Sequence, residues 1–175
     1  AIVATPLFSI GIKCPSVDLK NIETVRQTSA MRVAISLIFG RASDFYCENY
    51  SLGLLSERFF AGYTTSRGAA HIIITGTSEN CELVLEKAIA EIEYRKTHFF
   101  TDEQVNREKK AAYAECLTLF DNGEDLANSY AVGAFYNYDE FDCMEILRDI
   151  TPEEIKTALC SINTENSAIS IIKKG

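Results

Sequence analysis

Hydrophobic and polar residues alternate with a period of two at both ends of the chain, which is typical of half-buried strands. One such run is Leu7 to Lys13, and a shorter one, Ser167 to Ile172, closes the chain. Two further runs rich in aromatic or β-branched residues, Arg58 to Thr65 and Ala70 to Gly76, are joined by a short polar link that holds Gly68. This spacing predicts an antiparallel hairpin.

Between these strands the apolar residues follow helical spacing. The segment from Asn21 to Phe39 is apolar on most sides, so we expect a buried helix that ends at Gly40. Ser43 with Asp44 can cap a second, short helix that runs to about Leu52 and stops at Gly53. Further helices are predicted from Ser78 and Glu79, from the capping box Thr101–Gln104 to the turn at Asp121–Gly123, from Glu124 to Tyr136, from Glu140 to Arg148, and from the capping box Thr151–Glu154.

The predicted order of elements is therefore β-α-α-β-β-α-α-α-α-α-β. Helices grouped between strands in this way favour the α+β class, with an antiparallel sheet of about four or more strands and the helices packed on one face. A chain of 175 residues fits a single domain, residues 1–175. It opens on AIVATPLF, without a starting Met, so we expect a processed chain or an excised piece of a longer one.

Composition excludes several classes of function. With 47% hydrophobic and 24% charged residues the chain is ordinary for a globular domain, and its net charge of -8 argues against nucleic acid as a partner. The longest apolar run, Met31 to Phe39, is too short to span a membrane and contains Arg32. Six cysteines without a CxxC motif predict reduced, buried, structural thiols of a cytoplasmic protein, with disulfide pairing as the open alternative.

Few residues in the chain suggest chemistry. The two histidines, His71 and His98, lie in different predicted elements rather than one helical turn apart, so a zinc site is not predicted. There is no GxSxG, no Walker motif and no GxGxxG, although a triad assembled by the fold stays open. Tyr46, Tyr50 and Tyr63 group around the short helix and the hairpin. Core packing is the favoured interpretation of these rings, and the wall of a substrate site is the alternative.

Several segments in succession resemble a known family. They are LFSIGIK, the helix that ends in IFG, SDFYCENYSLGLLSERF with the hairpin after it, and FDCMEILRDITPEEIKTAL. Together they are similar to the C-terminal half of pitrilysin-type zinc peptidases, a group that includes insulin-degrading enzymes and mitochondrial processing peptidases, and above all to small bacterial cytoplasmic members. The resemblance implies a clamshell of two similar halves, each made of two α+β domains, around a closed chamber.

The resemblance also implies where the chemistry belongs. The family's zinc centre, an HxxEH helix with a distal Glu, lies in the N-terminal half, and this chain has no HxxEH. We therefore expect no catalytic residue, no metal ligand and no cofactor in this chain, and zinc in the N-terminal half of the parent. Some members add an Arg and a Tyr seven residues apart, and the matching positions here hold Tyr50 and Glu57. Tyr50, Glu57, Arg58 and Tyr63 are the candidates for the wall of the substrate chamber.

The sequence thus predicts a non-catalytic C-terminal domain that closes the chamber and helps to bind extended peptide. The expected partners are the N-terminal half of the same chain or a partner subunit, and peptide substrate, with no nucleic acid and no membrane. Two alternatives stay open. One is an inactive paralogue that serves as a scaffold or core subunit, and the other is an unrelated α+β ligand-binding module.

Overall fold

A four-stranded antiparallel sheet forms the base of the molecule. The computed structural model describes residues 4–15, 22–66 and 68–174. The strands are β1 (Leu7–Cys14), β2 (Phe60–Ser66), β3 (Ala69–Thr77) and β4 (Ser167–Ile172), in the spatial order β2-β3-β1-β4. Leu7 of β1 lies opposite Thr77 of β3 on one side and Ile172 of β4 on the other. The first and last strands of the chain are therefore neighbours, and the predicted α+β class is confirmed.

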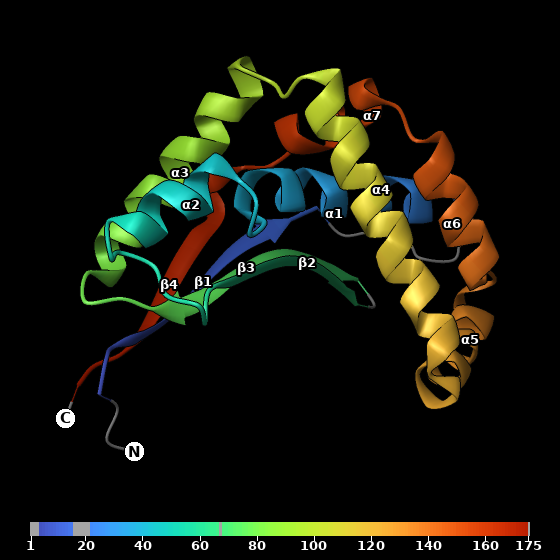
Figure 1. Cartoon of the computed structure of the whole chain (residues 1–175), viewed down its shortest axis with the longest axis horizontal. Helices are drawn as coiled ribbons and strands as arrows, with labels where there is room; N and C mark the ends of the chain where they lie inside the picture. Colours follow the sequence, from blue (N-terminus) through green and yellow to red (C-terminus); the bar gives the residue numbers. More distant parts are fainter. Residues whose placement is uncertain (1–3, 16–21, 67, 175) are drawn as a thin grey trace.

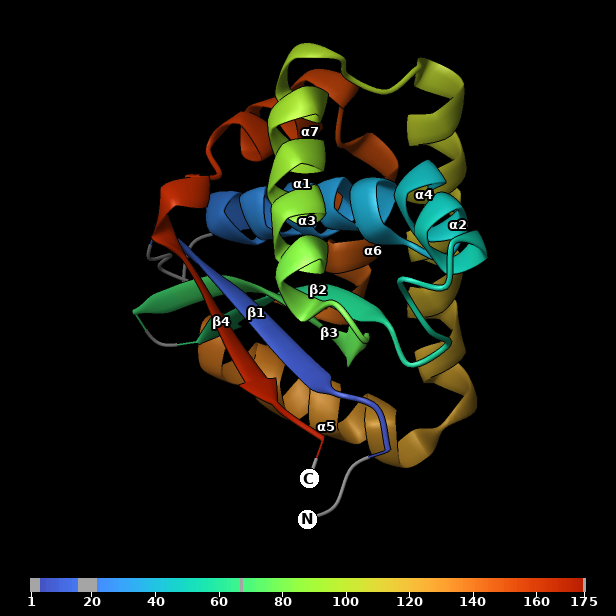
Figure 2. The same ribbon diagram turned by 90° about the vertical axis from the view of Figure 1, so that its left-hand side faces the viewer.

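Helix α1 (Ile22–Phe39) covers one face of this sheet (Figures 1 and 2). The alternating residues Phe8, Ile10 and Ile12 of β1 are buried on that face, as are Ile72 and Ile74 of β3. Each fully buried side chain of this size contributes about 1.5–3 kcal/mol of hydrophobic stabilisation. The prediction of a buried central helix is confirmed, and its expected first residue lies outside the described residues.

The remaining helices are α2 (Asp44–Ser51), α3 (Cys81–Thr97), α4 (Asp102–Thr118), α5 (Gly123–Tyr136), α6 (Glu140–Asp149) and α7 (Pro152–Cys160), with 3-10 turns η1 (Leu119–Asp121) and η2 (Thr164–Asn166). All of these α-helices except α5 pack around α1, and α5 packs against α6 and η1. The two predicted capping boxes are present at the starts of α4 and α7. Helix α3 begins later than expected, because Asn80 rather than Ser78 accepts the capping hydrogen bond, from the Leu83 amide.

Strand β2 also begins later than the sequence pattern predicts. Arg58 was expected in the strand, but pairing with β3 starts at Phe60. The preceding residues form a turn instead, in which the Phe59 amide donates to the Ser56 carbonyl and the Arg58 amide to Ser56 Oγ. This turn frees the side chains of Glu57 and Arg58 from the sheet, and it shapes the candidate site.

The cysteines follow the sequence prediction in part. All six are free thiols, and Cys14 and Cys81 are buried as expected. Cys47 and Cys160 are exposed, so the expectation of burial is wrong for them. Cys47 lies in α2, a short helix in which few side chains face the core. Among the described residues, no helix combines the length and apolar character that crossing a bilayer requires.

Candidate functional site

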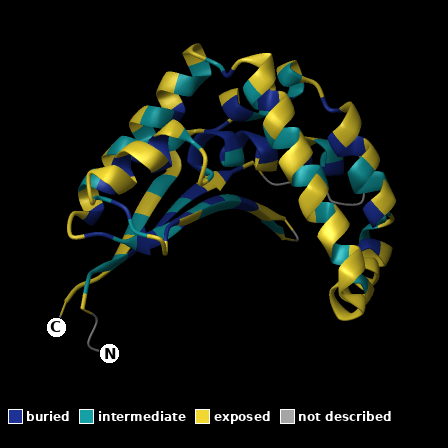
Figure 3. Cartoon of the chain, in the orientation of Figure 1, coloured by how far each residue is buried: buried dark blue, intermediate teal, exposed yellow. Residues whose placement is uncertain are grey.

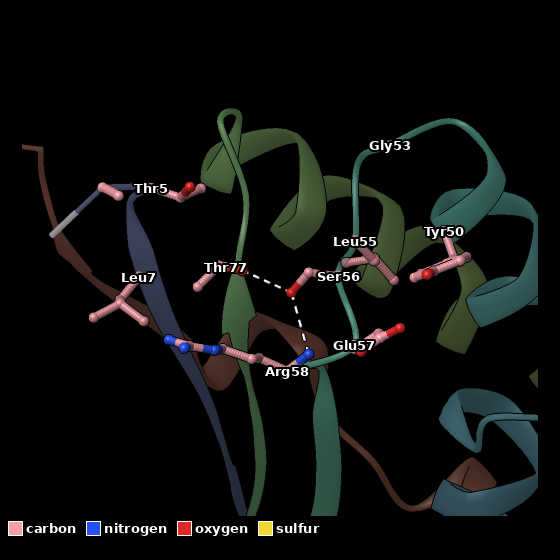
Figure 4. A pocket seen from close by; sticks show the side chains of 10 residues that line it. Thr5, Leu7, Tyr50, Gly53, Leu55, Ser56, Glu57, Arg58 and Thr77 are labelled. Carbon is pink, nitrogen blue, oxygen red and sulfur yellow. Dashed lines mark hydrogen bonds between the residues drawn. The ribbon is translucent and has the colours of Figure 1, made fainter.

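A cavity of about 860 Å³ lies at the end of the sheet where β1 begins and β3 ends. It collects three of the four residues that the sequence suggested, Tyr50, Glu57 and Arg58, from the end of α2 and the turn before β2 (Figure 4). The other lining residues are Ala4, Thr5, Leu7, Gly53, Leu55, Ser56 and Thr77. The wall is therefore built from three stretches of the chain, residues 4–7, residues 50–58 and Thr77.

Helix α2 places Tyr50 at the rim of this cavity. The helix starts at the predicted cap, where Ser43 Oγ accepts from the Tyr46 amide at 3.1 Å. One turn on, the rings of Tyr46 and Tyr50 stack with centroids 5.5 Å apart. Tyr46 is buried whereas Tyr50 is 44% exposed. The inner ring thus holds the outer one in a fixed orientation, because a stacked pair restricts rotation of the exposed member.

Beyond α2 the backbone reverses at Gly53, which has a φ of 71°. A positive φ is readily adopted by glycine, which explains the stop that the sequence predicted. The amides of Leu54 and Leu55 both donate to the Asn49 carbonyl, at 2.9 and 3.1 Å. Asn49 in turn donates its side-chain amide to the Phe45 carbonyl at 2.7 Å. The return loop is therefore fixed to the helix that it leaves.

Side-chain hydrogen bonds attach the following turn to the sheet and to α1. Ser56 Oγ lies 2.6 Å from Thr77 Oγ1 at the end of β3 (Figure 4). Arg41, just after α1, donates to the carbonyl of Glu57 and, at 3.0 Å, to the hydroxyl of Tyr46. With the backbone of the turn held in this way, the Arg58 side chain extends toward Leu7, and that of Glu57 lies on the side of Tyr50 (Figure 4).

Tyr63 is not part of this site. It lies within β2 opposite Ile72, it is 9% exposed, and burial raises the pKa of its hydroxyl. It lines a second cavity of about 640 Å³ between α1 and α7. The structure therefore brings together three of the four sequence candidates and separates the fourth, which packs as the core interpretation of the tyrosines predicted.

The cavity offers binding groups rather than a reaction centre. It presents a carboxylate, a guanidinium, hydroxyls and an aromatic ring, which suit hydrogen bonds and ion pairs to an extended chain. His71 lies in β3, and His98 follows α3, where it stacks on Tyr94 at 4.3 Å. In the part of the chain that the structure describes, no group of three or more His, Cys, Asp or Glu is placed to hold a metal. The residues present therefore do not fit a zinc site.

Sequence reasoning did not identify Arg41, Asn49 or Thr77 as residues of this region. Arg41 and Asn49 position the wall through backbone groups. Such contacts leave no sequence pattern, because any residue supplies the carbonyl that accepts the bond. The one available signal was a polar residue, Asn49, between two tyrosines of a short helix, where it is 3% exposed.

Comparison with known proteins gives this architecture a context. No protein-family profile matches the sequence. A structure of an M16-like peptidase from Alicyclobacillus acidocaldarius superposes with a TM-score of 0.85 at 20% identity, covering 97% of this chain and 41% of that one. The inactive peptidase domain of a zinc protease from Bordetella parapertussis superposes with a TM-score of 0.76 at 13% identity, covering 100% of this chain and 97% of that one.

The chain has the fold of an M16-like peptidase domain. In sequence it is 23% identical over 157 residues to the uncharacterized zinc protease YmfH of Bacillus subtilis (strain 168). This match covers 90% of the chain and 36% of the relative, so the chain spans about a third of that protein's length. The resemblance to pitrilysin-type peptidases, noted from the sequence, is confirmed as a likeness of fold, and the matched structures include an inactive domain of nearly the same extent.

Proposed function

We propose that this chain is the non-catalytic C-terminal domain of a larger pitrilysin-like zinc peptidase. It closes the substrate chamber and holds extended peptide, while a second half supplies the zinc and the general base. The lengths of the relatives support this proposal, because the chain spans 36% of the curated relative and 41% of the M16-like peptidase. More than half of each of those proteins is thus available for a catalytic part.

The observation that carries the peptide-binding part is the cavity shared by Tyr50, Glu57 and Arg58. It lies beside the ends of β1 and β3, where β3 continues beyond the first residue of β2. A peptide lying there meets fixed hydroxyls on one side and two opposite charges on the other. Opposite charges with an aromatic rim bind polar backbone and varied side chains, so we expect broad sequence tolerance.

Peptide binding is measured by fluorescence anisotropy with a fluorescein-labelled, unstructured peptide of mixed sequence. Tyr50→Ala and Glu57→Gln are expected to weaken binding about threefold to tenfold, as for moderate contributors at an interface. Both side chains are exposed, so the folded state is retained. Tyr94→Ala is the matched control for Tyr50→Ala, because Tyr94 is 49% exposed on α3, outside the cavity.

Glu86→Gln on α3 serves as the control for Glu57→Gln, since Glu86 is also exposed and does not line the cavity. Equal affinity in all four variants and the parent chain would show that the cavity is not a peptide site. If the chain binds no peptide but still associates with a zinc-bearing half, the scaffold alternative is favoured instead.

The proposal also places zinc outside this chain. Isothermal titration with Zn²⁺ is expected to show no stoichiometric, tight site in the purified domain, because its histidines stand in separate elements. A single tight site with a one-to-one ratio would contradict the proposal.

A reducing compartment is part of the same proposal. Free thiols at the surface are typical of cytoplasmic proteins, because disulfides form readily in oxidising compartments. Cys47 and Cys160 are exposed free thiols. We therefore place the protein in the cytoplasm. Fractionation of cells that express it, with the thiols trapped by alkylation before lysis, tests this directly; disulfide-bonded Cys47 or Cys160 would contradict it.

A further inference from the structure

Helix α5 exposes a broad set of apolar residues. At helical spacing the half-buried Leu126, Ser129 and Tyr136 and the buried Gly133 face the protein. The rest of the helix surface carries exposed apolar residues. They are Ala127, Tyr130, Ala131, Val132, Ala134 and Phe135. A usual surface helix keeps most of its apolar residues on the side that packs on the core.

Neighbouring segments enlarge this apolar surface. Phe120 of η1 and Phe141 of α6 are exposed, and their ring centroids lie 5.6 Å apart. We call these two rings and the six outward residues of α5 the α5 face. Among the described residues, six of the twelve exposed large hydrophobic side chains fall between residues 117 and 141. Such clustering marks an interaction surface, whereas scattered exposed residues are ordinary.

Helix α5 lies at the far end of the molecule from β4, at the lower right of Figure 1. Figure 3 colours most of its length as exposed, in contrast to the buried α1. Phe135 is 80% exposed, the highest value among the large apolar side chains that the structure describes. An apolar ring this exposed gains much from a partner, because most of its area is still to be removed from water.

The net charge of the protein is concentrated around this face. The chain holds 25 acidic and 17 basic residues. Eight of the acidic residues and none of the Lys or Arg lie between residues 111 and 147, so the rest of the chain is balanced. The exposed carboxylates Asp121, Glu124 and Asp125 stand at the start of α5. A partner surface must therefore be apolar at its centre and basic at its edge.

Charge also excludes two other occupants. A second copy would bring an equally acidic segment against this one, and like charges across an interface are unfavourable. An anionic membrane surface is repelled for the same reason. Two of the relatives are more than twice as long as this chain, which spans 36% and 41% of them. The lengths of these relatives therefore favour another part of the same protein as the partner that covers the α5 face.

We propose that the α5 face is the surface by which this domain docks on the zinc-bearing half of its parent peptidase, through an apolar patch of that half edged with Lys and Arg. The apolar residues of the α5 face supply the contact, and the acidic segment orients the partner and speeds its approach. This inference rests on the proposed function, since it names the surface that the predicted partner covers.

Site-specific photo-crosslinking in the full-length protein in its own cells tests the docking surface. The photoreactive residue p-benzoylphenylalanine replaces Phe135, and in a matched control it replaces Phe60, which is 59% exposed on β2. We expect an adduct from position 135 that maps, by mass spectrometry, to a Lys- or Arg-flanked apolar segment of the zinc-bearing half. Position 60 should not produce this adduct.

Affinity between the domain and the separately purified zinc-bearing half gives the second measurement. Phe135→Gln should weaken it by about tenfold or more, as expected of a central aromatic contact. Glu124→Gln combined with Asp125→Asn should weaken it at low salt and reduce its dependence on ionic strength. Thermal unfolding of Phe135→Gln alone should match the parent, because this side chain is exposed and outside the core. The acidic pair lies in the first turn of α5, so the double variant should lose a small amount of stability through the helix dipole while it stays folded.

Several results would overturn the inference. The first is an adduct from position 135 to a second copy of this chain, to lipid or to a peptide substrate. The second is the absence of any adduct. The third is an affinity for the zinc-bearing half that Phe135→Gln leaves unchanged. If peptide binding still depends on Tyr50 and Glu57 in that case, the docking surface is wrong and the proposed function stands. If no zinc-bearing half associates and no peptide binds, the proposed function itself is wrong.

Discussion

An ion pair joins the first and the last α-helices of the chain, and the stability lost on removing it can be predicted. Arg26 of α1 makes a two-point contact with Glu154 of α7: Nε donates to Oε1, and Nη2 lies 3.0 Å from Oε2. Glu154 also completes the capping box of α7, because its Oε2 accepts from the Thr151 amide at 2.8 Å. We predict that Glu154→Gln destabilises the domain through loss of the carboxylate charge, chiefly its ion pair with Arg26, since glutamine retains the capping function.

The magnitude follows from the pKa of Glu154. Hydrogen bonding to Arg26, reinforced by Thr151, lowers this pKa from its ordinary value of 4.5 to about 2. Without any screening by solvent, this lowering of the pKa would correspond to roughly 3 kcal/mol in the free energy of unfolding. The Glu154 side chain is 37% exposed, so solvent screens the pair. We therefore expect about 1 kcal/mol, which is about 2–4 °C in the unfolding midpoint of a domain of this size.

The pH dependence has a definite sign. Because the folded-state pKa is depressed, the carboxylate contributes its full stabilisation above the unfolded pKa, near 4.5. This contribution is lost as the pH falls from about 4.5 toward 2. The difference in free energy of unfolding between the parent chain and Glu154→Gln should accordingly be constant between neutral pH and about pH 5 and decrease below it.

Urea unfolding at pH 7, 5 and 3.5 measures this difference. The matched control is Glu153→Gln, because Glu153 is an exposed residue in the same first turn of α7. Like Glu154→Gln, it loses the favourable interaction with the helix dipole, worth about 0.3–1 kcal/mol, but it leaves the pair of Arg26 with Glu154 in place. The reasoning is refuted if both variants lose the same stability at pH 7, or if the Glu154→Gln difference is undiminished at pH 3.5.

Two further predictions concern α5 and the cysteines. A Cβ at Gly133 would lie 2.3 Å from the Tyr138 carbonyl oxygen, so Gly133→Ala should destabilise α5 by about 1–3 kcal/mol in native-state hydrogen exchange. Gly123→Ala is the control, because no atom lies within 4 Å of its Cβ position, and equal protection in both variants would contradict the packing. Burial raises the pKa of the Cys143 thiol to about 12, so at pH 8 iodoacetamide should modify the exposed Cys47 and Cys160 and leave Cys143. Modification of Cys143 at the rate of Cys47 in the native state would show that it is not protected.

The order of elements could be predicted from sequence because local rules decide it. Period-two alternation found β1 and β4, and the Thr101 and Thr151 capping boxes located the starts of α4 and α7. The boundaries that were wrong depend on tertiary contacts. Strand β2 begins at Phe60 rather than Arg58 because Ser56 bonds both to Thr77 and to the Arg58 amide, which bends the chain before pairing starts.

The site could be predicted only in part, for a similar reason. Tyr50, Glu57 and Arg58 were found because they lie close together in sequence around one glycine stop. Tyr63 was grouped with them by residue type, yet it lies within β2 and is turned toward the core. Thr77 and Leu7 were missed because they reach the cavity through strand pairing, which depends on register and leaves no local signal.

Helix α5 shows what an apolar pattern does and does not establish. The pattern predicts a helix over Glu124–Tyr136, and the structure has one over Gly123–Tyr136. The inward side of that helix is chosen by Gly133, which lets it approach the Tyr138 backbone closely. Apolar side chains there add little to the stability of the domain, because they are exposed in it. Their area can contribute free energy only when a partner covers it. In the docking that we propose, the apolar residues of α5 are buried in the assembly and not in the domain, so a disagreement between apolar pattern and burial in the domain points to the interface.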